Sequence, residues 1–107
     1  MATAPKSEIL HLTELANYQE GSVVSRQITK ADSGNVTLFA FDQDQELSEH
    51  TAPFDALVHI LDGSAEIKIS GKVFNLEAGD AIIMPANEPH ALKALKPFKM
   101  VLTMIRN

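Results

Sequence analysis

Most of the chain after Gly21 alternates apolar and polar residues in short runs, which is the pattern of β-strands. Between Ser64 and Ser70, apolar side chains occupy every second position, so this segment predicts a strand with one face in water. The Ser70-Gly71 pair predicts a tight turn, after which Lys72–Leu76 returns as the hairpin partner. The same reasoning predicts strands over Ala81–Met84, His90–Leu95 and Lys99–Ile105, separated by turns rich in Gly, Pro, Asn and Asp.

Two segments, Val36–Phe41 and Asp55–Asp62, are apolar at odd and even positions alike. A strand of this kind needs cover on both faces. One face would point into the core, and the other would meet a second layer, a terminal segment or another subunit. Because a small barrel cannot bury this much apolar surface alone, the sequence predicts a homodimer.

These features together predict an all-β fold. About eight short strands at even spacing, with no long helix, favour a closed barrel or a double-sheet jelly roll. Helical spacing of apolar residues occurs only within 12–19, which predicts a short helical turn in an N-terminal segment, 1–20. The length of 107 residues fits one domain, so residues 21–107 are expected to form a single barrel.

Composition and charge exclude several classes of function. A formal net charge of -5 does not suit a nucleic-acid-binding protein or an anionic membrane surface. No apolar stretch approaches the roughly 20 residues that span a bilayer, and no secretory signal is present at the start. The absence of cysteine excludes disulfides, thiolate metal sites and cysteine nucleophiles. We therefore expect a cytoplasmic protein with no nucleic-acid or membrane partner.

One stretch has the spacing of a known motif. From Gly79 to His90, the chain resembles the second conserved motif of the cupin family, with Gly79, Pro85 and His90 at the pattern positions. Asn87 stands where that motif has a second glycine, a substitution that asparagine tolerates because it adopts a left-handed backbone readily. Ala94 stands where the motif has asparagine.

The first cupin motif is less complete. Gly63 matches its end, and counting back places His50 at the first of its two histidines. Ala52 takes the place of the second histidine, Ala56 that of the glutamate, and Asp44 that of the opening glycine. The resemblance covers residues from about 34 to 105, and it implies the cupin double-stranded β-helix, a jelly-roll barrel.

The resemblance also implies where a metal would bind. The family site comprises three histidines and a glutamate, which hold Fe, Mn, Ni, Cu or Zn inside the barrel. This chain retains His50 and His90 of those four ligands, with Gln45 as a weaker third candidate. Strand parity directs Glu49 and His59 to the opposite face. A two-histidine metal site therefore requires that His50 and His90 face each other across the barrel interior.

Three functions follow from this pattern. Alanine at two ligand positions would widen an apolar pocket, whose predicted lining is His50, His90, Ala52, Ala56, Val58 and Leu92. Such a pocket suits a small molecule, although the same residues could simply fill a small core. The first hypothesis is thus a small-molecule-binding cupin. The alternatives are a metal-dependent enzyme of the isomerase or dioxygenase type, with unknown catalytic residues, and a dimeric structural protein with a vestigial pocket.

Overall fold

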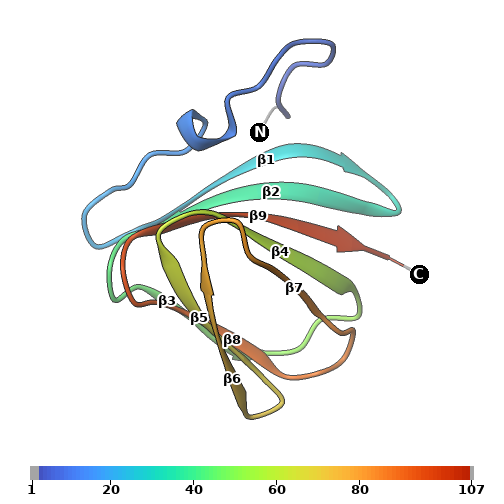
Figure 1. The fold of residues 1–107 in the computed structure, drawn as a ribbon. Coiled ribbons are helices and arrows are strands. Elements are labelled where there is room, and N and C mark those ends of the chain that lie inside the picture. Colours follow the sequence, from blue (N-terminus) through green and yellow to red (C-terminus); the bar gives the residue numbers. More distant parts are fainter. Residues whose placement is uncertain (1–2, 107) are drawn as a thin grey trace.

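The chain forms two antiparallel β-sheets that face each other, as Figure 1 shows. The structure is a computed structural model, and it describes residues 3–106. Its strands are β1 (Val23–Ala31), β2 (Gly34–Phe41), β3 (Glu46–His50), β4 (Asp55–Asp62), β5 (Ser64–Ile69), β6 (Lys72–Glu77), β7 (Ala81–Met84), β8 (His90–Ala94) and β9 (Phe98–Ile105). β7 has the predicted bounds, whereas β6 and β9 are each one residue longer than predicted.

The strand order is that of a jelly roll. One sheet has the order β1-β2-β9-β4-β7 and the other the order β3-β8-β5-β6, so strands distant in sequence are neighbours in both. The all-β jelly-roll fold predicted from the alternation is therefore confirmed. No helix within residues 3–106 is long and apolar enough to cross a membrane.

The core lies between the two sheets. Its largest fully buried side chains are Phe41 and Phe98, whose rings stack with centroids 4.5 Å apart and have no exposed surface. The other buried side chains of this cluster come from both sheets: Ala56, Val58, Ile60, Ala65, Ile67, Leu76, Met84, Leu92, Ala94 and Met100. Because each strand contributes alternate residues, the buried positions follow the period of two that the sequence shows.

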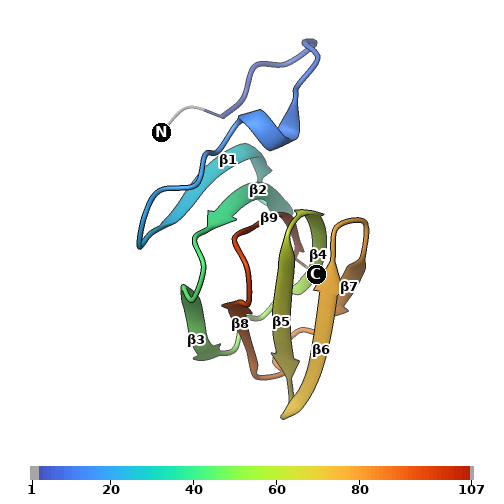
Figure 2. The same ribbon diagram turned by 60° about the vertical axis from the view of Figure 1, so that its left-hand side comes forward.

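The N-terminal segment packs on the outer side of β1 and β2 of the five-stranded sheet (Figure 2). Its only helix within residues 3–106 is a short 3-10 turn, η1 (Leu12–Glu14), inside the predicted range 12–19. Ala4 and Ala16 pack with Leu38 and Ala40 of β2 in a second apolar cluster. The outer face of Val36–Phe41 is thus covered by a terminal segment of the same chain, which was one of the three predicted forms of cover.

The outer face of β4, unlike that of β2, carries an exposed apolar side chain. Ala56, Val58 and Ile60 point into the core, while Leu57 on the opposite face is 39% exposed. Leu57 pairs with Ile83 of β7, which is 61% exposed. This part of the sheet carries apolar side chains that the described chain leaves in contact with water.

Two positions where the resembled motifs have glycine carry other residues in a left-handed backbone conformation. Asp44 has φ 68° and Asn87 has φ 66°, both in the left-handed region that glycine favours. The left-handed backbone predicted for Asn87 is therefore present. At Gly63, by contrast, a Cβ atom would lie 1.9 Å from the carbonyl oxygen of Pro97, so only glycine fits.

Candidate functional site

His50 and His90 meet at one end of the barrel, with their Nε2 atoms 3.1 Å apart. The two rings are nearly perpendicular, with centroids 4.4 Å apart and planes at 68°. They are direct cross-strand partners on β3 and β8, which are neighbours in the four-stranded sheet. The prediction that the two imidazoles face each other holds, but they do so side by side on one sheet rather than across the interior.

A β-bulge makes this meeting possible. Leu47 pairs with Leu92 and His50 pairs with His90, so β3 has one more residue than β8 between the two pairs. In a regular strand, residues three apart point to opposite faces. The extra residue allows Leu47 to pack against the core while His50 still turns toward His90.

The backbone fixes the tautomer of both rings. The Nδ1 of His50 lies 2.7 Å from the carbonyl oxygen of Ser48, and the Nδ1 of His90 lies 3.1 Å from that of Glu88. A carbonyl oxygen can only accept, so each Nδ1 carries the proton and donates it. In neutral imidazoles both Nε2 atoms then carry lone pairs, and the two atoms are 3.1 Å apart. A proton or a metal cation bound by both nitrogens would relieve the repulsion between these lone pairs.

At His90, protonation is less favourable than metal binding as a way to relieve this repulsion. This side chain is 5% exposed, and burial lowers its pKa below the ordinary value of 6.5. The hydrogen bond to the Glu88 carbonyl raises the pKa, while the neighbouring His50 charge lowers it. The pKa of His90 is lowered overall, which favours neutral imidazole, the form that binds metals.

Two loops close this end of the barrel, which we call the mouth, around the histidines. Residues 51–54 join β3 to β4, and residues 85–89 join β7 to β8. The Asn87 N–H donates to the Ala52 carbonyl at 2.8 Å, and the Ala86 N–H donates to the Asp55 carboxylate at 2.8 Å. Ala52 is therefore at the predicted end of the barrel, half-buried, and contributes through its backbone.

The remaining predicted pocket residues lie in the packed core. Val58 has no exposed surface, and Leu92 and Ala56 are 3% and 4% exposed. Ala56 pairs with Met84 on one side and Met104 on the other, and both methionines belong to or pack against the core cluster. Methionine side chains thus occupy the interior next to the alanine, and the role of these positions in binding a ligand stays a prediction.

Gln45, the weaker candidate ligand, lies away from the histidine pair. Its carbonyl accepts from the Ala94 N–H at 2.9 Å, four residues along β8 from His90. At about 3.4 Å per residue, the separation along the strand is roughly 14 Å. Within residues 3–106, no group of three or more His, Cys, Asp or Glu side chains is placed to hold a metal ion.

Sequence reasoning missed two residues at the mouth. Met104 pairs with Ala56, and continuing this register places Arg106 opposite Phe54. The Arg106 guanidinium carbon lies over the Phe54 ring, 4.9 Å from its centroid. Strand parity could have found both, because Arg106 and Phe54 lie two residues from the inward-facing Met104 and Ala56.

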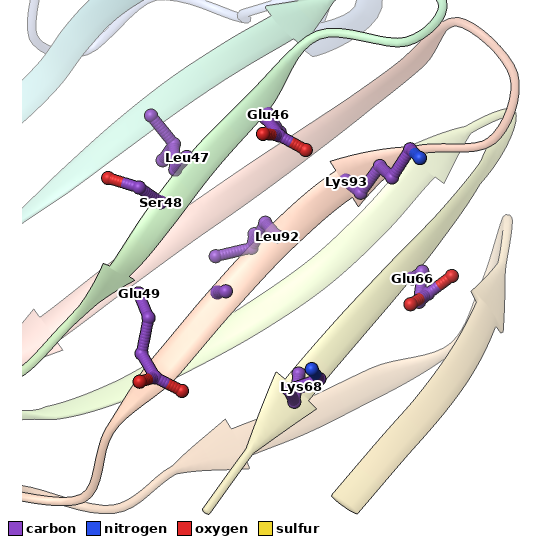
Figure 3. Close-up of a pocket in the computed structure, with 9 residues that line it drawn as sticks. Glu46, Leu47, Ser48, Glu49, Glu66, Lys68, Leu92 and Lys93 are labelled. Atoms are coloured by element: carbon purple, nitrogen blue, oxygen red, sulfur yellow. The ribbon is translucent and has the colours of Figure 1, made fainter. Parts of the chain in front are cut away.

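A separate hollow of about 300 Å³ lies on the outer face of the four-stranded sheet (Figure 3). Charged side chains of both signs line it, and Glu46, Lys93 and Glu66 are consecutive cross-strand partners on β3, β8 and β5. Glu49 also lines this hollow, and its orientation relative to His50 stays a prediction. Opposite charges in direct register are typical of a solvated sheet face that supports strand pairing.

Comparisons with known proteins agree with the fold. The family model described as "Cupin domain" matches residues 37–106. A conserved protein of unknown function from Streptococcus pyogenes is 33% identical with a TM-score of 0.92, covering 100% of this chain and 96% of that one. A cupin superfamily protein from Desulfitobacterium hafniense is 27% identical with a TM-score of 0.91, covering 99% and 97%.

A third solved structure is the cupin 2 conserved barrel domain protein from Leptotrichia buccalis. It is 36% identical with a TM-score of 0.88, and the match covers 91% of this chain and 47% of that one. No curated protein matches the chain significantly. These matches cover nearly the whole chain, and none of the three matched structures is named for a specific activity.

Proposed function

Because the chain belongs to the cupin family, whose barrels often bind metals, we propose that it is a metal-binding cupin. In this proposal His50 and His90 together hold one divalent first-row transition metal at the mouth of the barrel. The observation that carries the proposal is the pair of facing Nε2 atoms, 3.1 Å apart, with both Nδ1 atoms bound to carbonyls.

The spacing of the two nitrogens suits a shared metal ion. Metal–imidazole bonds of about 2.0–2.1 Å that start from these two atoms would meet at an angle of roughly 100°. That angle lies between the values for octahedral and tetrahedral ligands. The carbonyl bonds at Ser48 and Glu88 already hold the tautomer that a metal requires, since metal-bound histidines usually donate their other N–H.

The donor set admits Fe, Mn, Ni, Cu or Zn. Imidazole suits Fe, Ni, Cu and Zn, whereas Mn prefers oxygen ligands, and affinity for a nitrogen site generally increases from Mn to Cu. With two ligands from the protein, further coordination positions would go to water or to a small molecule. A bound metal would supply Lewis-acid chemistry, by polarising a carbonyl group or by activating water.

The small molecule would bind at the mouth. Val58 and Ile60, deeper in the barrel, have no exposed surface, so the interior leaves no path for a ligand without movement of the core. His50 is an exposed residue and His90 is nearly buried, which places the pair at the boundary between solvent and core. Ser48 and Glu88 orient the rings through their backbone carbonyls, independently of their side chains.

Calorimetric titration of the metal-free protein with Ni²⁺ tests the proposal. We expect one ion per chain for the wild type, and His50→Ala and His90→Ala should each weaken binding by roughly tenfold or more. His59→Ala is the matched control, because His59 is exposed on the outer face of β4 and should leave the affinity unchanged. Equal loss in all three variants, or no binding by the wild type, would show that the pair is not a metal site.

A further inference from the structure

The N-terminal segment, residues 4–18, is held on the barrel by few contacts. Within residues 3–106 it makes one backbone–backbone hydrogen bond to a strand, from the Ala4 N–H to the Ile28 carbonyl at 2.9 Å. Ile28 lies where the register of β1 against β2 shifts, so it has no partner on β2. Among residues 4–18, only Ala4 and Ala16 are buried, and each contributes a single methyl group.

Two polar contacts latch the far end of this segment to the sheet. Lys99 and Asp62 are cross-strand partners on β9 and β4, and the segment contacts both. The Tyr18 hydroxyl donates to the Asp62 carboxylate at 2.6 Å. The Lys99 Nζ donates to the Thr13 carbonyl and lies 4.9 Å from the Tyr18 ring centroid. Because Lys99 is only 9% exposed, its ammonium group depends on these partners for hydrogen bonding and charge stabilisation.

The connection between this latch and the first strand is short and exposed. The Gly21 N–H donates to the Asp42 carboxylate at 2.7 Å, which anchors the chain just before β1. Residues 19–20, between this anchor and Tyr18, are both exposed. Rotation about these two residues would therefore lift the segment from the sheet without disturbing β1.

The surface under the segment is apolar and separate from the main core. The cluster around Phe41 and Phe98 lies between the two sheets and comprises different residues from the cluster under the segment. Leu38 and Val101 are cross-strand partners in that second cluster. Removal of the segment would expose them on the same outer face as Leu57, while the core between the sheets would stay packed.

We propose that residues 4–18 form a latched strap, which opens as one unit while the barrel stays folded and thereby uncovers the apolar outer face of β2 and β9. Segments with few buried apolar contacts open at a lower free energy than the whole domain. The Tyr18–Asp62 and Lys99–Thr13 hydrogen bonds set the closed population. This inference does not depend on the proposed metal function, because the strap contacts the five-stranded sheet and both histidines are on the other one.

Amide hydrogen exchange followed by NMR tests the strap, because the Ala4 N–H is bonded to β1 only while the strap is docked. Tyr18→Phe removes the hydroxyl and keeps the ring. It should speed exchange at Ala4 roughly tenfold, because a hydrogen bond to a charged carboxylate is lost. Lys99→Met keeps an unbranched side chain without the donor, and it should also speed exchange at Ala4. Lys68→Met is the matched control, since Lys68 is exposed on β5 of the other sheet.

The amides of β9 distinguish opening of the strap from unfolding of the barrel. They should exchange at the wild-type rate in Tyr18→Phe, while the amide of Ala4 exchanges faster. A terminus that frays one residue at a time would leave exchange at Ala4 insensitive to the hydroxyl at position 18, and that result would overturn the proposal. Equal acceleration at Ala4 and in β9 would also overturn it, because the segment would then unfold only together with the barrel.

Discussion

His50 and His90 are forty residues apart in sequence, yet they are directly opposite each other on adjacent strands. Their spacing is therefore set by the hydrogen-bonded ladder of a sheet, not by flexible loops. Paired residues of antiparallel strands have fixed Cα separations of about 4.5–5.5 Å, which leaves little freedom in the distance between the two rings. A site built in this way needs little rearrangement to chelate an ion.

Metal binding should consequently raise the thermal stability of the protein. An ion that binds only the folded state at 100 times its Kd adds about 2.7 kcal/mol to the free energy of unfolding. For a domain of this size, that corresponds to a rise in Tm of roughly 10 °C or more. Differential scanning calorimetry with and without Ni²⁺ measures the rise, and it should disappear in His90→Ala but persist in His59→Ala.

Replacing a ring of the buried aromatic pair should nearly unfold the protein. Phe98 stacks on Phe41 and has no exposed surface, so Phe98→Ala should lower the free energy of unfolding by about 3–5 kcal/mol. That is a large part of the roughly 5–15 kcal/mol expected for a whole domain. Urea denaturation measures the loss. Phe98→Leu should cost clearly less, and equal losses for the two variants would contradict the predicted cavity.

Two turn glycines should differ in their tolerance of alanine. Gly63 and Gly71 both have positive φ, 76° and 84°, so alanine costs about 1–2 kcal/mol of backbone strain at either. At Gly71 a Cβ has no atom within 4 Å, whereas at Gly63 it collides with the Pro97 backbone. Gly63→Ala should therefore destabilise the protein by several kcal/mol more than Gly71→Ala, as judged by urea denaturation. Similar midpoints would contradict this.

Much of the fold was predictable because strand patterns are local. The alternation over Ser64–Ser70 and the turn at Ser70-Gly71 depend only on neighbouring residues, and the hairpin β5–β6 has the predicted pairing. The family resemblance predicted that His50 and His90 meet. The bulge after Leu47 was not predictable, because it depends on how β3 pairs with β8, and it is this pairing that puts the two rings side by side.

The space inside the barrel, by contrast, was not predictable from local sequence patterns. Alanine at position 56 suggested a wider pocket, but its cross-strand neighbours Met84 and Met104 come from segments 28 and 48 residues away. The alternation predicted that Ala56 and Val58 point inward, and they do. Whether space remains there is decided by side chains from other strands, and long flexible methionines fill gaps of this kind well.

Tyr18 should titrate far above the ordinary range for tyrosine. Its hydroxyl donates to the Asp62 carboxylate at 2.6 Å, and burial together with this bond raises its pKa above the ordinary value of 10.0. Lys99, whose Nζ lies 4.9 Å from the ring centroid, is the nearby cation. Because the folded state favours the neutral phenol, the stabilisation is complete below pH 10 and is lost as the pH rises beyond it.

Ultraviolet absorbance measures this titration directly, because the chain has one tyrosine and no tryptophan. The folded protein should form tyrosinate only at higher pH than the urea-unfolded chain. Asp62→Asn removes the acceptor charge and should shift the titration toward the unfolded one. Coincident titrations of folded and unfolded protein would mean that the N-terminal segment does not dock on the sheet.

The homodimer stays a prediction, and we expect it to use the exposed apolar side chains of the five-stranded sheet. Leu57, Ile83 and Ile105 are exposed on β4, β7 and β9, in the same sheet face that the N-terminal segment covers further along. Beside them lies a hollow of about 270 Å³ between the β1–β2 hairpin and β9. In a two-fold dimer, the protruding Ile83 of each copy can enter the hollow of the other.

The two outer sheet faces differ in polarity. The four-stranded sheet presents charged side chains of both signs, Glu46, Glu49, Glu66, Lys68 and Lys93, whereas β4 and β7 of the other sheet present the apolar side chains of Leu57 and Ile83. Sedimentation velocity over a concentration series should show a dimer for the wild type and a monomer for Ile83→Glu. Val73→Glu is the matched control, because Val73 is 47% exposed on β6 of the other sheet. A wild type that is monomeric throughout, or equal disruption by Val73→Glu, would rule out this interface.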